Sequence, residues 1–301
     1  MEKYNKLEKD PKTEAEQIRS RAVLLCPDND AEADMILTVA EKAGISVIRS
    51  QQPHGANLGL EPDLELKLSE FKKPEVWIVE TPGLEKEEEL AGKGFNVKII
   101  DHHTYQNVDR LTDPETGNKK LSSLEQFLAM AKISDDEMEE WGLNPKIVRG
   151  IGIMDAKYVR GLRDGEYSKD EINQVFELKQ KIIEKIQPEF DKLLKLAKED
   201  WENKNEQNGN LVIKSEHGGD IRGAITEVSI LHDMDTVPMV ISVDNGKKIT
   251  VQNITPEIVE KLNQNIKGNT YTFGSGLCWG VNNKDKNNNI TLEEVLNVLG
   301  K

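Results

Sequence analysis

Residues 96–103, NVKIIDHH, decide the fold, because a short apolar run there ends in one aspartate and two histidines. Such a run predicts a buried strand, and the three polar side chains follow its carboxyl end. Three further apolar segments also end in carboxylates: AVLLCPDNDAEAD at 22–34, VWIVETPG at 76–83 and GIGIMDAKY at 150–158. Four acidic segment ends in one chain predict a shared site.

Residues 21–165 alternate short apolar runs with helical patterns, which is typical of an α/β domain with a mainly parallel sheet. The carboxyl ends of parallel strands meet at one edge, where ligands normally bind. We therefore expect the acidic and imidazole side chains to lie together. Such ligands suit manganese or magnesium, whereas structural zinc sites favour thiolates. A close pair of metal ions activates a bridging water and clamps the oxygens of a phosphoester.

The order of these motifs, PDNDA, an acidic strand end, DHH and GIGIMD, resembles the DHH phosphoesterase family. The family includes RecJ-type nucleases, nano-RNases, cyclic-dinucleotide phosphodiesterases and family II pyrophosphatases. By that resemblance Asp101 would act in catalysis as an orienting residue, and His103 would face the substrate phosphate. The implied metal ligands are Asp28 for a first ion, Asp30, His102 and Asp155 for a second, and Glu80 as a bridge between the two.

Two positions depart from the family pattern. Many members carry a histidine four residues before the first motif aspartate, where this chain has Leu24, which cannot ligate. The bridging position is usually aspartate, and Glu80 is longer by one methylene, about 1.5 Å of reach. A single aspartate at a strand end is also typical of a turn or a helix cap. The complete set of motifs, and no single residue, therefore carries the metal-site prediction.

The chain of 301 residues predicts two domains of ordinary size. We expect a DHH catalytic domain at 1–167, a connecting helix at 168–207, and a smaller α/β domain at 208–301 that corresponds to the DHH-associated C-terminal substrate domain. Pro188 falls inside the connecting helix and should kink it or start a second helix.

A glycine-rich stretch, YTFGSGLCWG at 271–280, occupies the place of a GGGH segment in the family. The resemblance implies that Gly274, Ser275 and Gly276 bind substrate phosphate, since small residues let backbone amides approach an anion. A glycine-rich turn without a ligand is the alternative. It is favoured by Leu277, which replaces the family histidine.

The stretch NKDKNNNITLEE at 283–294 has the spacing of a calcium-binding EF-hand loop. Its five ligand positions would be Asn283, Asp285, Asn287, Asn289 and Glu294. An asparagine in the first position supplies less charge than an aspartate. A calcium site and a polar turn before a capped helix are both compatible with this stretch.

The formal net charge is −14, and no basic cluster interrupts it. Arg149, Lys157, Arg160 and Arg163 follow the fourth motif and either guide phosphates or form a solvated helix face. Tracking a long duplex normally needs a positive stripe that releases counterions. We therefore expect a small nucleotide or a short oligonucleotide as substrate, and no long duplex.

No apolar run approaches the roughly 20 residues that span a bilayer. The charged start of the chain, MEKYNKLEKDPKTEAEQIRS, lacks the apolar core of a signal peptide. We therefore expect no membrane partner and a cytoplasmic protein, and an oligomer is compatible with the sequence.

Together these features predict a manganese- or magnesium-dependent phosphoesterase that hydrolyses a short nucleotide substrate with a metal-activated water. The alternative is a catalytically impaired DHH-fold protein that binds nucleotides or a partner, which Leu24, Glu80 and Leu277 favour. A pyrophosphatase would need lysines and arginines in a phosphate pocket of the second domain, where the sequence offers few candidates.

Overall fold

The computed structural model describes residues 13–53, 55–105, 108–186, 189–218, 221–232, 234, 236–268, 270–283 and 289–300. The chain forms two compact units. The first holds the chain up to Asp155 together with Gln174–Ile182, and the second holds Ala156–Asn173 together with the chain from Ile183 onward. The division into catalytic, connecting and substrate parts at 167 and 207 stays a prediction.

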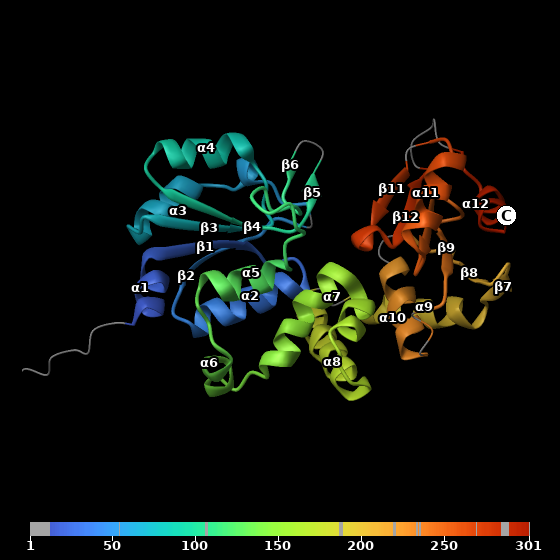
Figure 1. The fold of residues 1–301 in the computed structure, drawn as a ribbon, viewed down its shortest axis with the longest axis horizontal. Coiled ribbons are helices and arrows are strands. Elements are labelled where there is room, and N and C mark those ends of the chain that lie inside the picture. Colours follow the sequence, from blue (N-terminus) through green and yellow to red (C-terminus); the bar gives the residue numbers. More distant parts are fainter. Residues whose placement is uncertain are drawn as a thin grey trace, which may run out of the picture. The chain divides into compact units, whose positions relative to one another are not determined.

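The first unit is built on a four-stranded parallel sheet with the strand order β2-β1-β3-β4 (Figure 1). The strands are β1 (Ala22–Pro27), β2 (Ser46–Ser50), β3 (Glu75–Val79) and β4 (Asn96–Ile100). β1 is buried along its whole length, as expected of a central strand with helices on both faces. The predicted parallel sheet is confirmed.

The remaining elements of this unit are helices and one short hairpin. They are α1 (Glu14–Arg21), α2 (Ala31–Lys42), η1 (Leu58–Leu60), α3 (Leu64–Phe71), α4 (Leu84–Gly92), β5 (Thr104–Tyr105), β6 (Val108–Asp109), α5 (Ser123–Met130), α6 (Asp135–Glu140), α7 (Pro145–Asp164) and α8 (Lys169–Ile186), the last two being shared with the second unit. Figure 1 shows α3 and α4 over one face of the sheet and α2 and α5 over the other. Leu25, Leu68 and Leu90 pack together on the first face. On the other face Trp77 meets Phe127 edge to face, with ring centroids 6.3 Å apart.

α7 contains Asp155, the aspartate of the fourth motif, and places it near the strand ends. A Cβ atom at Gly152 would lie 2.3 Å from Ser122 Oγ and 2.9 Å from Glu32 Oε1, so a larger residue would push the helix away. Beyond Asp155 the helix breaks at Tyr158, whose φ is 56° and ψ is −165°. The glycine therefore sets how closely Asp155 approaches the strand ends.

The second unit has a six-stranded sheet of order β11-β12-β10-β9-β8-β7, in which β8 and β9 run parallel and the other neighbours antiparallel. Its elements are α9 (Phe190–Glu202), β7 (Asn205–Gln207), β8 (Asn210–Lys214), α10 (Ile221–Leu231), β9 (Met239–Val243), β10 (Lys248–Gln252), α11 (Pro256–Asn265), β11 (Thr270–Phe273), η2 (Gly274–Gly276), β12 (Cys278–Asn282) and α12 (Leu292–Leu299). Leu262 of α11 and Val295 of α12 share a core with Trp279 of β12. The predicted smaller α/β part is thus present.

The predicted connection at 168–207 contains two helices, α8 and α9. Pro188 lies between them, outside the described residues. Among the helices of the described ranges, none combines the length and the apolar character needed to cross a membrane.

Candidate metal centre

The carboxyl ends of three neighbouring strands position the site. Asp28 directly follows β1, Glu80 follows β3 and Asp101 follows β4. Because the three strands are parallel neighbours, these residues leave the sheet at the same edge. Glu80 has a φ of 42°, a left-handed conformation that costs a non-glycine residue about 1–3 kcal/mol. Its backbone N–H donates to the carbonyl of Ile100 at 3.1 Å, which holds this strained residue in place.

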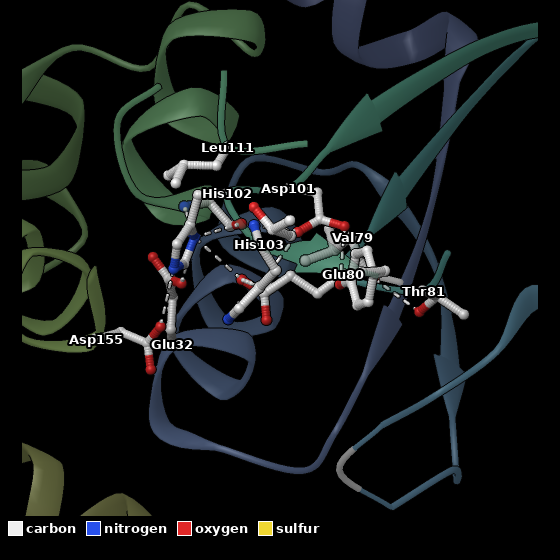
Figure 2. A network of polar contacts seen from close by, with 12 residues as sticks. Glu32, Val79, Glu80, Thr81, Asp101, His102, His103, Leu111 and Asp155 are labelled. Carbon is white, nitrogen blue, oxygen red and sulfur yellow. Dashed lines mark hydrogen bonds and ion pairs between the residues drawn. The ribbon is translucent and has the colours of Figure 1, made fainter. Parts of the chain in front are cut away.

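Four predicted site residues come together at this edge. Glu80, His102, His103 and Asp155 each offer a ligand atom, and all four atoms lie within 4.8 Å of one another. His102 Nε2 is 3.2 Å from Asp155 Oδ2, and His102 Nδ1 is 3.4 Å from Glu80 Oε1. Figure 2 shows this group, with the side chains converging around the His102 ring. Two carboxylates and two imidazoles at this spacing form a donor set suited to a divalent cation.

Asp101 lies behind His103 and holds it. It is fully buried, and its Oδ1 accepts the backbone N–H of His103 at 3.0 Å and lies 3.2 Å from His103 Nδ1. The hydroxyl of Tyr105 donates to Asp101 Oδ2 at 2.9 Å. Asp101 therefore makes the contacts expected of an orienting residue, and Tyr105 is an additional member that the sequence did not reveal.

The crowding of carboxylates shifts the proton affinities of the site. Burial, together with the nearby Asp155 and Asp30 carboxylates, raises the pKa of Glu80 to about 7. Burial alone would lower the pKa of His103, but the hydrogen bond to Asp101 and the charge of Glu80 outweigh it and raise this pKa to about 9. The site therefore attracts positive charge.

Glu32 is a fifth acidic member that sequence reasoning missed. It lies in the first turn of α2 with only 1% of its surface exposed. Its Oε1 accepts the backbone N–H of Leu124 at 2.8 Å, and its Oε2 lies 3.8 Å from His102 Nδ1. Burial and the carboxylates of Asp155 and Glu80 raise the pKa of Glu32 well above its usual value. The sequence held one signal for it, a glutamate between Ala31 and Ala33 in a helix whose neighbouring positions are apolar.

Several buried acceptors of this region have no hydrogen-bond partner. They are Asp28 Oδ1, Asn29 Oδ1, Glu32 Oε2 and Glu80 Oε1. Leaving one such atom unsatisfied costs about 1–3 kcal/mol, and more when the group is charged. Since all four are acceptors, they lack a cation or a proton rather than another carboxylate. The oxygen of Glu80 fits a divalent ion held with His102 and Asp155, and the oxygen of Asp28 requires positive charge on its own side of the site.

The remaining two predicted ligands are engaged elsewhere. Asp28 Oδ2 accepts a hydrogen bond from Arg49 Nη1 at 3.0 Å. Asp30 Oδ1 accepts the backbone N–H of Ala33 at 2.8 Å and so caps α2. Leu24 is fully buried in β1. Of the predicted ligands, Glu80, His102 and Asp155 are thus gathered in the described residues, and their roles as ligands stay a prediction.

In the second unit the glycine-rich turn borders a cavity. Gly274–Gly276 form η2, and both glycines have positive φ values, 58° and 86°. A cavity of about 330 Å³ is lined by Gly274 and Leu277 from this turn, by apolar side chains that include Val159 and Ile230, and by the carboxylate of Asp164. Its cationic and polar lining side chains include Lys157, Arg160, Arg163, Thr226, Ser229, Gln252 and Asn253. Gln252 is 2% exposed, accepts the Thr226 hydroxyl at 3.0 Å, and leaves its Nε2 without a partner. The cavity therefore offers an unsatisfied donor beside several cations.

The described part of the EF-hand-like stretch makes the contacts of a turn and a helix cap. Asn283 donates from Nδ2 to the carbonyls of Gly246 and Ile290, at 2.8 and 2.7 Å. Glu294 accepts the backbone N–H of Thr291 at 2.7 Å in the capping box of α12. These contacts favour the polar-turn interpretation. Two of the five calcium candidates, Asp285 and Asn287, lie outside the described residues.

No family model and no curated protein matches the sequence. Among solved structures, the chain is similar to the exonuclease RecJ bound to manganese, with 12% identity, 90% of each chain covered and a TM-score of 0.40. It is similar to the DHH domain of a member of a family of ribosomal proteins, with 13% identity, 95% of this chain and 86% of that chain covered and a TM-score of 0.49. It is also similar to the pGpG-specific phosphodiesterase PggH from Vibrio cholerae, with 10% identity, 92% and 95% coverage and a TM-score of 0.44.

At these identities the similarity concerns the fold alone. The order of the motifs, the parallel sheet and the residues gathered at its edge are features of this chain itself. The ligands and substrates of those proteins are therefore not assigned to this chain.

Proposed function

We propose that this protein is a divalent-metal-dependent phosphoesterase that hydrolyses a phosphoester of a small nucleotide or short oligonucleotide. The observation that carries the proposal is the group of Glu80, His102, His103 and Asp155, whose ligand atoms lie within 4.8 Å of one another. Two carboxylates with two imidazoles suit manganese or magnesium. The unpartnered Oε1 of Glu80 supports a cation at this place.

In this proposal Glu80, His102 and Asp155 hold the metal ion. The ion supplies Lewis acidity, which polarises a phosphoryl oxygen and lowers the pKa of water. The backbone N–H of Ser123 donates to His102 Nδ1 at 3.2 Å and so orients this imidazole, and Glu32 Oε2 places a carboxylate 3.8 Å from the same nitrogen.

His103 is proposed to meet the substrate phosphate. Its side chain is 39% exposed, whereas that of His102 is 7% exposed. With its pKa raised to about 9, the imidazole carries a positive charge at neutral pH. It is thereby suited to bind a phosphate oxygen or to donate a proton to the leaving alkoxide. Asp101 and Tyr105 keep the ring in this orientation.

The cavity of the second unit is proposed to bind a nucleotide. Its volume of about 330 Å³ suits a nucleoside-sized group and excludes a duplex. Lys157 and Arg160 provide positive charge, the Gln252 amide provides a hydrogen-bond donor, and the backbone amides of Gly274, Ser275 and Gly276 are proposed to approach a phosphate. We also propose that the metal ion is manganese or magnesium and that the protein is cytoplasmic.

An impaired, nucleotide-binding protein is the second candidate. It is favoured by the Arg49 contact to Asp28 together with Leu24, because both weaken one of the two metal positions that the family resemblance implies. The test is turnover of bis(p-nitrophenyl) phosphate and of short dinucleotides by purified protein, with manganese added to metal-free samples. Metal-dependent hydrolysis supports the enzyme. Tight nucleotide binding without turnover of any of these substrates would support the second candidate.

A further inference from the structure

Arg49 lies in β2, next to the strand that carries Asp28. Its Nη1 donates to Asp28 Oδ2 at 3.0 Å, and its Nη2 donates to Glu41 Oε1 at 2.7 Å. The parallel register explains the contact, because Arg49 pairs with Cys26 and Ser50 pairs with Pro27, directly before Asp28. The guanidinium is therefore clamped between a carboxylate at the site and a carboxylate on α2.

The side of the centre next to Arg49 offers few ligands. Leu24 is fully buried and supplies no donor. Asp30 uses its Oδ1 to cap α2. Asp28 shares its Oδ2 with Arg49. Its Oδ1 is buried without a hydrogen-bond partner, but a divalent ion on that oxygen would stand beside a fixed positive charge that repels it.

We propose that the Arg49 guanidinium takes the place of a first metal ion, so that the centre holds one divalent ion, at Glu80, His102 and Asp155. An arginine suits this role because its charge persists at every physiological pH and its planar fork matches a carboxylate. The inference rests on the proposed metal-dependent function for the His102 side. It concerns the opposite side, where this chain's own cation neutralises Asp28.

The test counts bound manganese in metal-free protein by isothermal titration and by electron paramagnetic resonance of the free ion. Wild-type protein is expected to bind one ion tightly. Arg49→Gln keeps a hydrogen-bonding side chain but removes the charge, and it is expected to add a second site at least tenfold tighter than any second event in the wild type. Arg49→Lys, which keeps the charge, and Glu41→Gln, which leaves the Asp28 contact in place, are expected to remain at one ion.

The possible failures are distinguishable. Two equally tight ions in wild-type protein would overturn the role of Arg49 while leaving the metal-dependent function intact, whereas no bound ion would contradict the proposed function itself. One ion in a folded Arg49→Gln protein would also overturn the inference. Should that variant not fold, Asp28→Asn decides: an unchanged affinity of the single site supports the inference, and a tenfold loss shows that Asp28 is a ligand in the wild type.

Discussion

The two sides of the candidate centre differ in how their carboxylates are balanced. On the His102 side, Glu80 and Glu32 each keep a buried oxygen without a partner, and burial raises the pKa of both. On the other side, Asp28 Oδ1 also lacks a hydrogen-bond partner, but Asp28 Oδ2 meets the charged Arg49 at 3.0 Å. The comparison teaches that the number of carboxylates does not determine where a metal ion binds. A metal ion binds where buried carboxylate charge is left that the protein's own cationic side chains do not neutralise.

Removing His102 should have the largest effect. His102→Ala deletes the residue that contacts both Glu80 and Asp155. The loss of Lewis-acid stabilisation is worth several kcal/mol, which corresponds to a fall in kcat/KM of about a thousandfold. Titration calorimetry of the variant should also show no tight manganese site. His217→Ala, a change at an exposed loop histidine of the second unit, is the matched control. Normal turnover by folded His102→Ala protein would contradict the proposed centre.

The stability of the metal-free protein should fall as pH rises. Glu80 has a pKa of about 7 when folded against an ordinary value of 4.5, and His103 has about 9 against 6.5. The folded state therefore binds more protons than the unfolded state between these limits, and the free energy of unfolding declines through pH 4.5–7 for Glu80 and through pH 6.5–9 for His103. For the buried Glu80 the decline is on the order of 3 kcal/mol.

Urea unfolding of metal-free protein from pH 5 to pH 9 measures this trend. Glu80→Gln should flatten the acidic part of the curve, because the amide does not titrate. Manganese should reverse the trend, since the ion displaces the Glu80 proton and binds more tightly at higher pH. A metal-free protein whose stability rises steadily across this range would show that the site does not hold excess protons.

Glu32→Gln should lower manganese affinity by about tenfold, because it removes a buried carboxylate that lies 3.8 Å from His102 Nδ1 and adds negative charge to the centre. The same change should leave the fold intact, because the amide oxygen can still accept the Leu124 N–H. Glu88→Gln, at an exposed position of α4, provides the control. Unchanged affinity and kcat in Glu32→Gln would show that Glu32 is only a structural cap for α5.

The difference between the two sides also marks the limit of sequence analysis. The strand ends at Glu80 and Asp101 followed from apolar runs and from the rule that parallel strands end at one edge. The Arg49–Asp28 contact could not be predicted in this way, because it depends on the register between β1 and β2. Glu32 was missed because burial of a helix residue depends on the rotation of α2 against its neighbours.

The second unit was harder to predict for the same reason. The glycine-rich turn was visible in the sequence, but its cavity depends on side chains from α7, α10 and β10. Gln252 lines this cavity, and only the structure shows that its amide nitrogen is buried without a hydrogen-bond partner. Long-range packing of this kind leaves no local pattern.

The smallest expected effect concerns Tyr105, whose hydroxyl donates to Asp101 Oδ2. Tyr105→Phe removes the hydrogen bond that fixes the position of Asp101 Oδ2, so the carboxylate is less well placed to hold the His103 imidazolium. The pKa of His103 should then decrease, and the alkaline limb of the pH–rate profile should move to lower pH. At neutral pH kcat should fall by roughly threefold to tenfold, which corresponds to the loss of one hydrogen bond of about 1 kcal/mol.

Manganese affinity should stay unchanged, because Tyr105 contacts Asp101 and no residue that we propose to hold the metal ion. Tyr271→Phe in the second unit is the control. A loss of metal affinity with an unmoved pH profile would mean that Tyr105 supports the metal side of the centre instead of the orientation of His103.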